Sequence, residues 1–233
     1  MSDLLMIVPT RNRPQNAMDL YRAWVDSTSA ESALLFVCDE DDPQLHSYKN
    51  QMRWMPRAQL LTVPVGLRMV GALNHAASLF TVDYQYLGFM GDDHRTRTYG
   101  WDDRIRGVIK HPVGVAYGND LLQGENMPTA VVLTSNIVDK LGYMVPPCLE
   151  HLCADLVWKD WGEALGCLIY LDDVYIEHMH PANGKAMMDA GYERANSSDQ
   201  STRDAQAYYS YKDGDFNRDV AKLKELLAVS SPQ

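Results

Sequence analysis

The chain has 233 residues, of which 46% are hydrophobic, and its formal net charge is −10 at pH 7. This length and composition suit one globular domain, or one domain with a small appendage. The acidic balance excludes a general electrostatic attraction to nucleic acid or to anionic membranes, although it leaves room for a local basic groove.

Short apolar runs alternate with helical patterns through the first hundred residues. This alternation is typical of a parallel sheet with crossover helices. The predicted strands are Leu4–Val8, Ala33–Cys38, Leu60–Val65 and Tyr86–Met90, and the predicted helices are Gln15–Ser27, His46–Met55 and Leu67–Leu79.

The rest of the chain is less regular. Its predicted helices are Trp101–Lys110, Ser135–Leu141, Glu150–Leu165 and the amphipathic Phe216–Val229, and its predicted strands are Val113–Tyr117, Ala130–Thr134 and Leu168–Leu171. The polar, Ser-rich stretch Asn196–Ser201 is predicted to be a loop. We therefore expect an α/β fold with a mixed, mainly parallel sheet flanked by helices.

The sequence carries no sign of a membrane span or a signal peptide. No apolar stretch reaches the ~18 residues of a transmembrane helix, and the first residues lack a basic segment followed by a long apolar one. The four cysteines form no CxxC pair, so we expect reduced thiols in a cytoplasmic protein. Cys148, His151 and Cys153 lie close enough in sequence for a zinc site, but a fourth ligand at regular spacing is missing.

Polar clusters follow three of the first four predicted strands. They are TRNR at residues 10–13, DEDD at residues 39–42 and GDDH at residues 91–94. In open α/β sheets, ligands bind at the carboxyl ends of the strands. The clusters therefore stand where a binding site is expected, although a solvated loop would also be polar.

The adjacent carboxylates Asp92 and Asp93 need a partner, because two like charges at the end of a buried strand repel each other. A hard divalent cation such as Mn²⁺ or Mg²⁺ would supply one, since both prefer oxygen ligands. The alternative is ion pairing with Arg95, Arg97 or Arg104.

Two further motifs suggest chemistry. His178 and His180 alternate, so on an extended chain they share one face, and one imidazole could complete a metal site. Asp155 stands in an apolar helical stretch, where a raised pKa would suit a general base. The alternatives are ordinary loop histidines and a simple i,i+4 pair between Asp155 and Lys159.

Together these features resemble the GT-A glycosyltransferases, and among them the inverting, family 2-like enzymes, including small bacterial and phage versions. The resemblance covers roughly residues 4–181. It rests on the segment IVPTRNRP at residues 7–14, a strand ending in Asp39, the Asp-rich turn at Asp92 and Asp93, a helix carrying an acid, and a late histidine. The family's DxD motif is altered here, because its usual first acid falls at Met90.

The resemblance implies roles for particular positions. It assigns the donor nucleotide to Pro9, Thr10, Arg11, Asp39, Arg68, Asn74 and Asp92, the metal to Asp93 with His178 or His180, the general base to Asp155, and the acceptor or sugar to Trp158 or Trp161. It also implies a catalytic domain at 1–183, with a nucleotide-binding half at about 1–100 and an acceptor half at about 101–183. Residues 184–233 would form a C-terminal loop and helix that pack on it.

The activity implied by the resemblance is transfer of a hexose or pentose from a nucleotide-diphosphate sugar to an acceptor hydroxyl, with Mn²⁺ or Mg²⁺ as cofactor and inversion at the anomeric carbon. The acceptor stays open between a glycan, a protein, a small molecule and a modified DNA base.

Two other functions stay open. A nucleotidyltransferase would carry a glycine-rich basic loop after its first strand, where this chain has TRNRP. A non-catalytic GT-A domain that only binds a nucleotide sugar or a glycan would fit the missing first acid.

Overall fold

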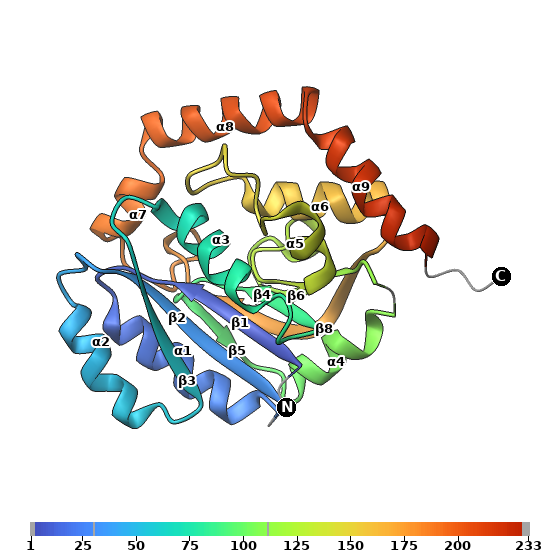
Figure 1. Ribbon diagram of the computed structural model, residues 1–233. Helices are drawn as coiled ribbons and strands as arrows, with labels where there is room; N and C mark the ends of the chain where they lie inside the picture. Colours follow the sequence, from blue (N-terminus) through green and yellow to red (C-terminus); the bar gives the residue numbers. More distant parts are fainter. Residues whose placement is uncertain (1–2, 30, 111, 230–233) are drawn as a thin grey trace.

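The computed structural model describes residues 3–29, 31–110 and 112–229; the end of the predicted C-terminal segment, 230–233, lies outside them (Figure 1). The strands are β1 (Leu4–Pro9), β2 (Ser32–Asp39), β3 (Ala58–Val63), β4 (Tyr86–Phe89), β5 (His94–Thr96), β6 (Val115–Asn119), β7 (Val131–Thr134) and β8 (Leu168–His178). The α-helices are α1 (Pro14–Ser27), α2 (Leu45–Gln51), α3 (Arg68–Phe80), α4 (Trp101–Val108), α5 (Ser135–Leu141), α6 (Ala154–Leu165), α7 (Ala190–Ala195), α8 (Ser198–Asp213) and α9 (Phe216–Val229). Short 3₁₀ turns cover Met52–Trp54, Gly124–Asn126 and Pro181–Asn183.

The strands form one sheet of eight, in the order β3-β2-β1-β4-β7-β6-β8-β5. The strands β3, β2, β1 and β4 are mutually parallel, as the alternation of strands and helices predicts. β7 runs antiparallel to both β4 and β6, and β8 runs parallel to β6. β5 is the edge strand beyond β8 and runs antiparallel to it. The expected mixed, mainly parallel α/β fold is therefore confirmed.

Helices cover both faces of the sheet (Figure 1). Alternate residues of β1 point to opposite sides, so Leu4 and Met6 pack with α1 and α4, while Leu5 and Ile7 pack with α3, α5, α6 and α9. All four of these side chains are buried. Burial on both faces explains why β1 reads as a continuous apolar run, and it places the polar ends of the strands on a rigid base.

The strands next to the acidic turn differ from the prediction. The predicted strand Leu168–Leu171 continues to His178, with a shift of register near Asn119, and β5 was not predicted. β5 is three residues long and has no apolar pattern, because its pairing with β8 defines it. This pairing sets His94 opposite His178.

The helices near the C-terminus also differ. The predicted loop at Asn196–Ser201 is wrong: Ser197 caps α8 by accepting a hydrogen bond from the Gln200 amide. The helix predicted to start at Glu150 starts at Ala154 instead. Cys153, in the left-handed region at φ +67°, separates it from an irregular segment. Among the described residues, no helix is both long and apolar enough to cross a membrane.

Candidate active site

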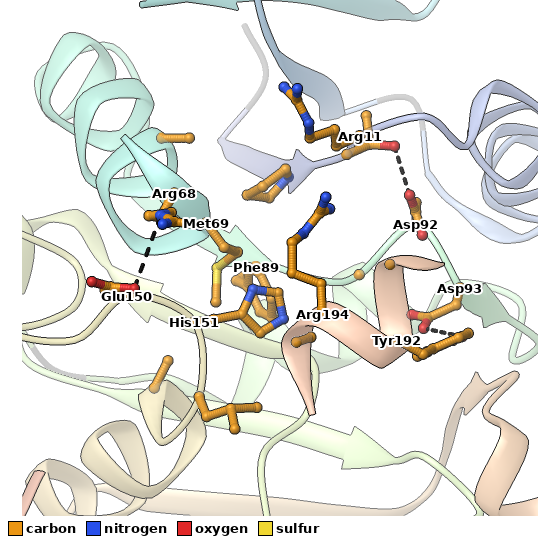
Figure 2. A pocket seen from close by; sticks show the side chains of 18 of the residues that line it. Arg11, Arg68, Met69, Phe89, Asp92, Asp93, Glu150, His151, Tyr192 and Arg194 are labelled. Atoms are coloured by element: carbon orange, nitrogen blue, oxygen red, sulfur yellow. Dashed lines mark hydrogen bonds and ion pairs between the residues drawn. The ribbon is translucent and has the colours of Figure 1, made fainter. Parts of the chain in front are cut away.

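A cavity of about 620 Å³ opens at the carboxyl ends of β1, β2 and β4. Its other walls are the start of α3, the irregular segment 150–153 with the start of α6, and α7. Figure 2 shows side chains from these separate elements pointing into one space. Of the predicted site residues, the structure brings to this cavity Pro9, Thr10, Arg11, Asp39, Arg68, Asp92, Asp93, Asp155, Trp158, His178 and His180.

Asp92 is held by residues that follow β1. The Thr10 hydroxyl donates a hydrogen bond of 2.6 Å to Asp92 Oδ2, and Arg13 Nη1 lies 3.4 Å from Oδ1. Burial and the neighbouring charge of Asp93 raise the pKa of Asp92 to about 6, against the opposing effect of Arg13. Both oxygens of Asp92 thus already have protein partners.

Asp93 lies among imidazoles. His94 Nδ1 is 3.3 Å from Oδ1 of Asp93, and His178 Nε2 is 3.4 Å from its Oδ2. The two rings stack with their centroids 4.3 Å apart. Burial alone would raise the pKa of Asp93, but contacts with both histidines hold it well below its usual value. Asp93 is therefore a carboxylate at neutral pH.

The backbone of the acidic turn depends on Gly91. A Cβ built on Gly91 would stand 2.5 Å from Asp93 Oδ1, closer than any side chain tolerates. The Gly91 amide also donates to His94 Nδ1 at 3.1 Å. The small residue thus allows the turn to fold its own carboxylate and imidazole back beside the strand end.

His178 lies between two carboxylates. Its Nδ1 is 3.8 Å from Oδ2 of Asp120, a residue that also accepts three backbone amides and the Thr129 hydroxyl. Burial lowers the pKa of His178, but contacts with Asp120 and Asp93 outweigh it and raise the pKa to about 9. His180 is less buried, and its Nδ1 accepts from the Ala182 amide.

Three side chains can hold a metal ion here. Asp93, His94 and His178 offer ligand atoms within 4.8 Å of one another. A carboxylate with imidazoles suits Mn²⁺ among other divalent ions. Of the two late histidines that the sequence left open, His178 belongs to this group and His180 does not.

The alternatives raised by the sequence find other partners. Among the described residues, Arg95 donates to the carbonyls of Asp92 and His94, Arg97 pairs with Glu177, and Arg104 pairs with Asp173. Within the part of the chain that the structure describes, none of these arginines forms an ion pair with either carboxylate of the acidic turn. Cys148, His151 and Cys153 form no metal-binding group within the described part of the chain.

An ion-pair cluster lies at one end of the cavity. Arg11 Nη1 contacts Asp39 Oδ2 at 2.7 Å and Asp41 Oδ1 at 2.6 Å. Pro9 and Val37, from the ends of β1 and β2, line the same region. This end offers carboxylates and one guanidinium beside apolar surface, a combination that suits a base and a ribose.

Asp155 lines the opposite part of the cavity, in the first turn of α6. Burial raises the pKa of its carboxyl group. The i,i+4 pair with Lys159 is absent from the described contacts, since Lys159 contacts Glu163 at 3.8 Å instead. Asp155 is thus a partly buried acid beside an open space, and within the described residues it forms no ion pair.

The segment before α6 is fixed from a distance. Asp204 of α8 accepts hydrogen bonds from the amides of Glu150, His151 and Leu152, at 2.8, 3.1 and 2.7 Å. Asn74, which the sequence assigned to the donor nucleotide, does not line the cavity. Its side chain forms hydrogen bonds with the backbone of Met144 and Val145 instead. Both polar side chains hold irregular backbone in place.

The two predicted tryptophans are buried in the core. Trp158 borders the cavity, packs on Phe89 and donates its Nε1 proton to the Met144 carbonyl. Trp161 does not line the cavity, and its Nε1 donates to the Tyr211 hydroxyl at 2.8 Å. Neither side chain is exposed.

Sequence reasoning missed several lining residues. Arg13 belongs to the TRNR cluster at residues 10–13, but no role was predicted for it. The sequence suggested His151 only as a possible zinc ligand. Tyr192 and Arg194 lie on α7, a helix that was not predicted. Nothing local in the sequence of α7 indicates a site, because the Tyr192 hydroxyl meets Asp93 across 99 positions of the chain.

No protein-family model and no curated protein sequence matches the chain. Solved structures do match it. Residues covering 76% of the chain align with 59% of TarS 1-349 from S. aureus in complex with UDP, at 13% identity and a TM-score of 0.59. Residues covering 99% of the chain align with 76% of the mannosyltransferase PcManGT from Pyrobaculum calidifontis, in complex with GDP-Man and Mn²⁺, at 12% identity and a TM-score of 0.61.

These likenesses show that the chain has the GT-A glycosyltransferase fold. The chain spans about 60% of the length of the TarS 1-349 fragment that it matches.

Proposed function

We propose that the chain is a metal-dependent glycosyltransferase that moves a sugar from a nucleotide-diphosphate sugar to an acceptor hydroxyl with inversion. One observation carries the proposal: a buried carboxylate with two imidazoles, Asp93, His94 and His178, and a second, partly buried acid, Asp155, line a single cavity at the strand ends. The fold supports it, because the similar structures include complexes with UDP and with GDP-Man and Mn²⁺.

The cavity suggests an arrangement of the donor. We place its base and ribose at Arg11, Asp39, Pro9 and Thr10, where the polar ends of β1 and β2 meet. Its diphosphate then lies toward Asp93 and His178, the residues that would hold the cation. A divalent ion bound there supplies positive charge to the phosphate oxygens as the leaving group departs.

The chain's own residues then perform the transfer. Asp155, deprotonated, removes the proton of the acceptor hydroxyl as that oxygen forms its bond to the anomeric carbon. The bond from the anomeric carbon to the diphosphate breaks on the opposite face, and the nucleotide diphosphate leaves as an anion. An inverting transfer needs one base of this kind, and Asp155 is a partly buried acid that borders the cavity and whose pKa is raised.

Thermal unfolding with nucleotide diphosphates tests the proposal. A ligand that binds only the folded state raises the melting temperature, by an amount equivalent to about 2.7 kcal/mol at one hundred times its Kd. We expect UDP or GDP to raise it only when Mn²⁺ or Mg²⁺ is present. The Asp93→Asn variant should lose that metal-dependent shift.

The matched control is Asp173→Asn, which removes an exposed carboxylate of β8 that pairs with Arg104. It should keep the metal-dependent shift. A nucleotide shift that is the same without metal, or that survives in Asp93→Asn, would contradict the proposed cation site. Slow hydrolysis of a UDP- or GDP-sugar without acceptor would separate an enzyme from a domain that only binds the donor.

A further inference from the structure

α7 lies across the cavity and joins it to the C-terminal helices. Five residues of this segment, Gly191, Tyr192, Arg194, Ala195 and Asn196, line the space. Tyr192 is the buried residue of the helix, while Glu193 and Arg194 are exposed. The segment just before it exposes Met187 and Met188. Tyr192 packs edge-on against the ring of His180, and the other contacts of α7 with the strand wall are polar.

The first contact joins Arg13 to Asp189, the residue that caps α7. Arg13 donates from Nε and Nη2 to the two carboxylate oxygens of Asp189, at 2.9 and 2.5 Å. The same carboxylate accepts from the amides of Gly191 and Tyr192. A Cβ on Gly191 would stand 2.8 Å from Arg13 Nη2, so the missing side chain lets the guanidinium approach the helix.

The second contact joins Tyr192 to the acidic turn. The Tyr192 hydroxyl donates a 2.7 Å hydrogen bond to Asp93 Oδ2 (Figure 2). The Arg13 guanidinium lies 4.1 Å from the centroid of the Tyr192 ring. Burial and the charge of Asp93 raise the pKa of Tyr192, so the phenol keeps its proton and remains a donor. The oxygen that it contacts is the one that faces His178.

Arg194 is the cation that α7 carries. Figure 2 shows its side chain rising from the helix into the space between Arg11 and His151. Within the described residues, its guanidinium forms no ion pair with a carboxylate, whereas Arg11 and Arg13 each contact two. Its place in the cavity is therefore set by how α7 is anchored.

We propose that Tyr192 is a positioning residue: its hydroxyl orients the Asp93 carboxylate for a divalent cation and ties the position of α7, with Arg194, to that carboxylate. The inference rests on the proposed function for the identity of the cation. Carboxylates that bind metals are themselves hydrogen-bonded, and loss of such a partner typically weakens metal binding about 10- to 100-fold. Tyr192 acts through Asp93 and does not need to touch the metal or the sugar.

The Tyr192→Phe variant tests this, since it removes the hydroxyl and keeps the ring beside Arg13. The matched control is Tyr208→Phe, because Tyr208 of α8 also donates a 2.7 Å hydrogen bond to a carboxylate, that of Asp160. Asp160 does not line the cavity. Two quantities are measured: Mn²⁺ binding, from the electron paramagnetic resonance of free Mn²⁺, and hydrogen exchange of the 190–196 amides without metal.

We expect Tyr192→Phe to weaken Mn²⁺ binding about 10-fold or more and to speed amide exchange in α7. Tyr208→Phe should do neither. Wild-type Mn²⁺ affinity in Tyr192→Phe would overturn the proposal.

If the wild-type protein binds no Mn²⁺, the proposed cation site is wrong. The anchoring of α7 is then tested only by hydrogen exchange of the 190–196 amides. In that case, faster exchange in Tyr192→Phe supports the tie between Tyr192 and Asp93. Unchanged exchange overturns it.

Discussion

The cavity has two walls that are built differently. The strand wall, formed by Thr10, Asp39, Asp92 and Asp93, follows β1, β2 and β4, whose side chains are buried on both faces of the sheet. The helical wall consists of the irregular segment 150–153, the first turn of α6 and the six-residue helix α7. The strand wall is positioned by packing, whereas the segment 150–152 and α7 depend on hydrogen bonds with side chains from elsewhere, those of Asp204 and Arg13.

The difference separates two tasks. Packed strands hold the charged groups of the strand wall at fixed distances, which suits the donor-binding role that we propose for this wall. Elements with few buried apolar contacts open locally at lower free energy. We therefore expect the segment 150–152 and α7 to move more readily than the strand wall.

The largest expected effect comes from removing the acid of the helical wall. Asp155→Asn should lower the rate of transfer by about 10²- to 10⁴-fold, the usual contribution of a general base. The binding of UDP or GDP, which we assign to the strand wall, should remain. Steady-state transfer rates and the melting shift with nucleotide measure the two quantities separately.

The pH profile sharpens this result. Burial raises the pKa of Asp155, so the wild-type rate should rise with pH through that raised pKa and then level off, because the base works only when deprotonated. The residual rate of Asp155→Asn should lack this rise with pH. An unchanged rate, or loss of nucleotide binding together with the rate, would contradict the assignment of Asp155 to the transfer step.

A smaller effect is expected on the free energy of unfolding, which allows the packing of the two walls to be compared. Phe36 of β2 is fully buried, and Phe36→Ala should cost about 3–5 kcal/mol of unfolding free energy through the cavity it leaves. Met187, 89% exposed before α7, is the control, and Met187→Ala should change stability by less than about 0.5 kcal/mol. Urea unfolding measures both. A large loss in Met187→Ala would mean that the α7 region is packed as the strands are.

The smallest effect concerns His151, a residue of the helical wall that lines the cavity. Burial lowers the pKa of His151 below its usual value. The folded state therefore resists protonation, and its stability is complete above the unfolded pKa of about 6.5 and falls as the pH drops below it. His151→Gln should reduce the loss of unfolding free energy between pH 7.5 and pH 5.

The exposed His75 of α3 supplies the control for this measurement. The same unfolding measurement on His75→Gln is the reference for replacing a histidine at an exposed helical position. If the pH dependence of the unfolding free energy is the same in His151→Gln and His75→Gln, then burial does not lower the pKa of His151.

The parallel half of the fold could be predicted from the sequence, because strands buried on both faces have to be apolar throughout. β1, β2 and β4 stand out for this reason. β5 does not, because three residues without an apolar pattern become a strand only through pairing with β8. α8 was missed because its first half is polar and buries Gln200 and Asp204, so that only its second half, with Tyr211, reaches the apolar core.

The candidate site divides in the same way. The acidic turn and the Arg11–Asp39 pair lie at strand ends, where topology indicates a site before any contact is known. The alternation of His178 and His180 indicated a shared face, and the pairing of β8 with β5 selected His178. Tyr192 and Arg194 could not be found, because a contact across 99 positions leaves no local pattern.

The three hydrogen bonds from Asp204 to the amides of residues 150–152 have a consequence for the order of folding. Chains are made from the N-terminus at about 5–20 residues per second, and early segments can fold as they emerge. The strand wall is complete by residue 93, so the part of the cavity that we propose for the donor can assemble while the rest of the chain is still being made. The segment before Asp155, our proposed base, has to wait for the side chain of Asp204, some fifty residues further on, so we expect the proposed donor end of the cavity to form before the proposed catalytic end.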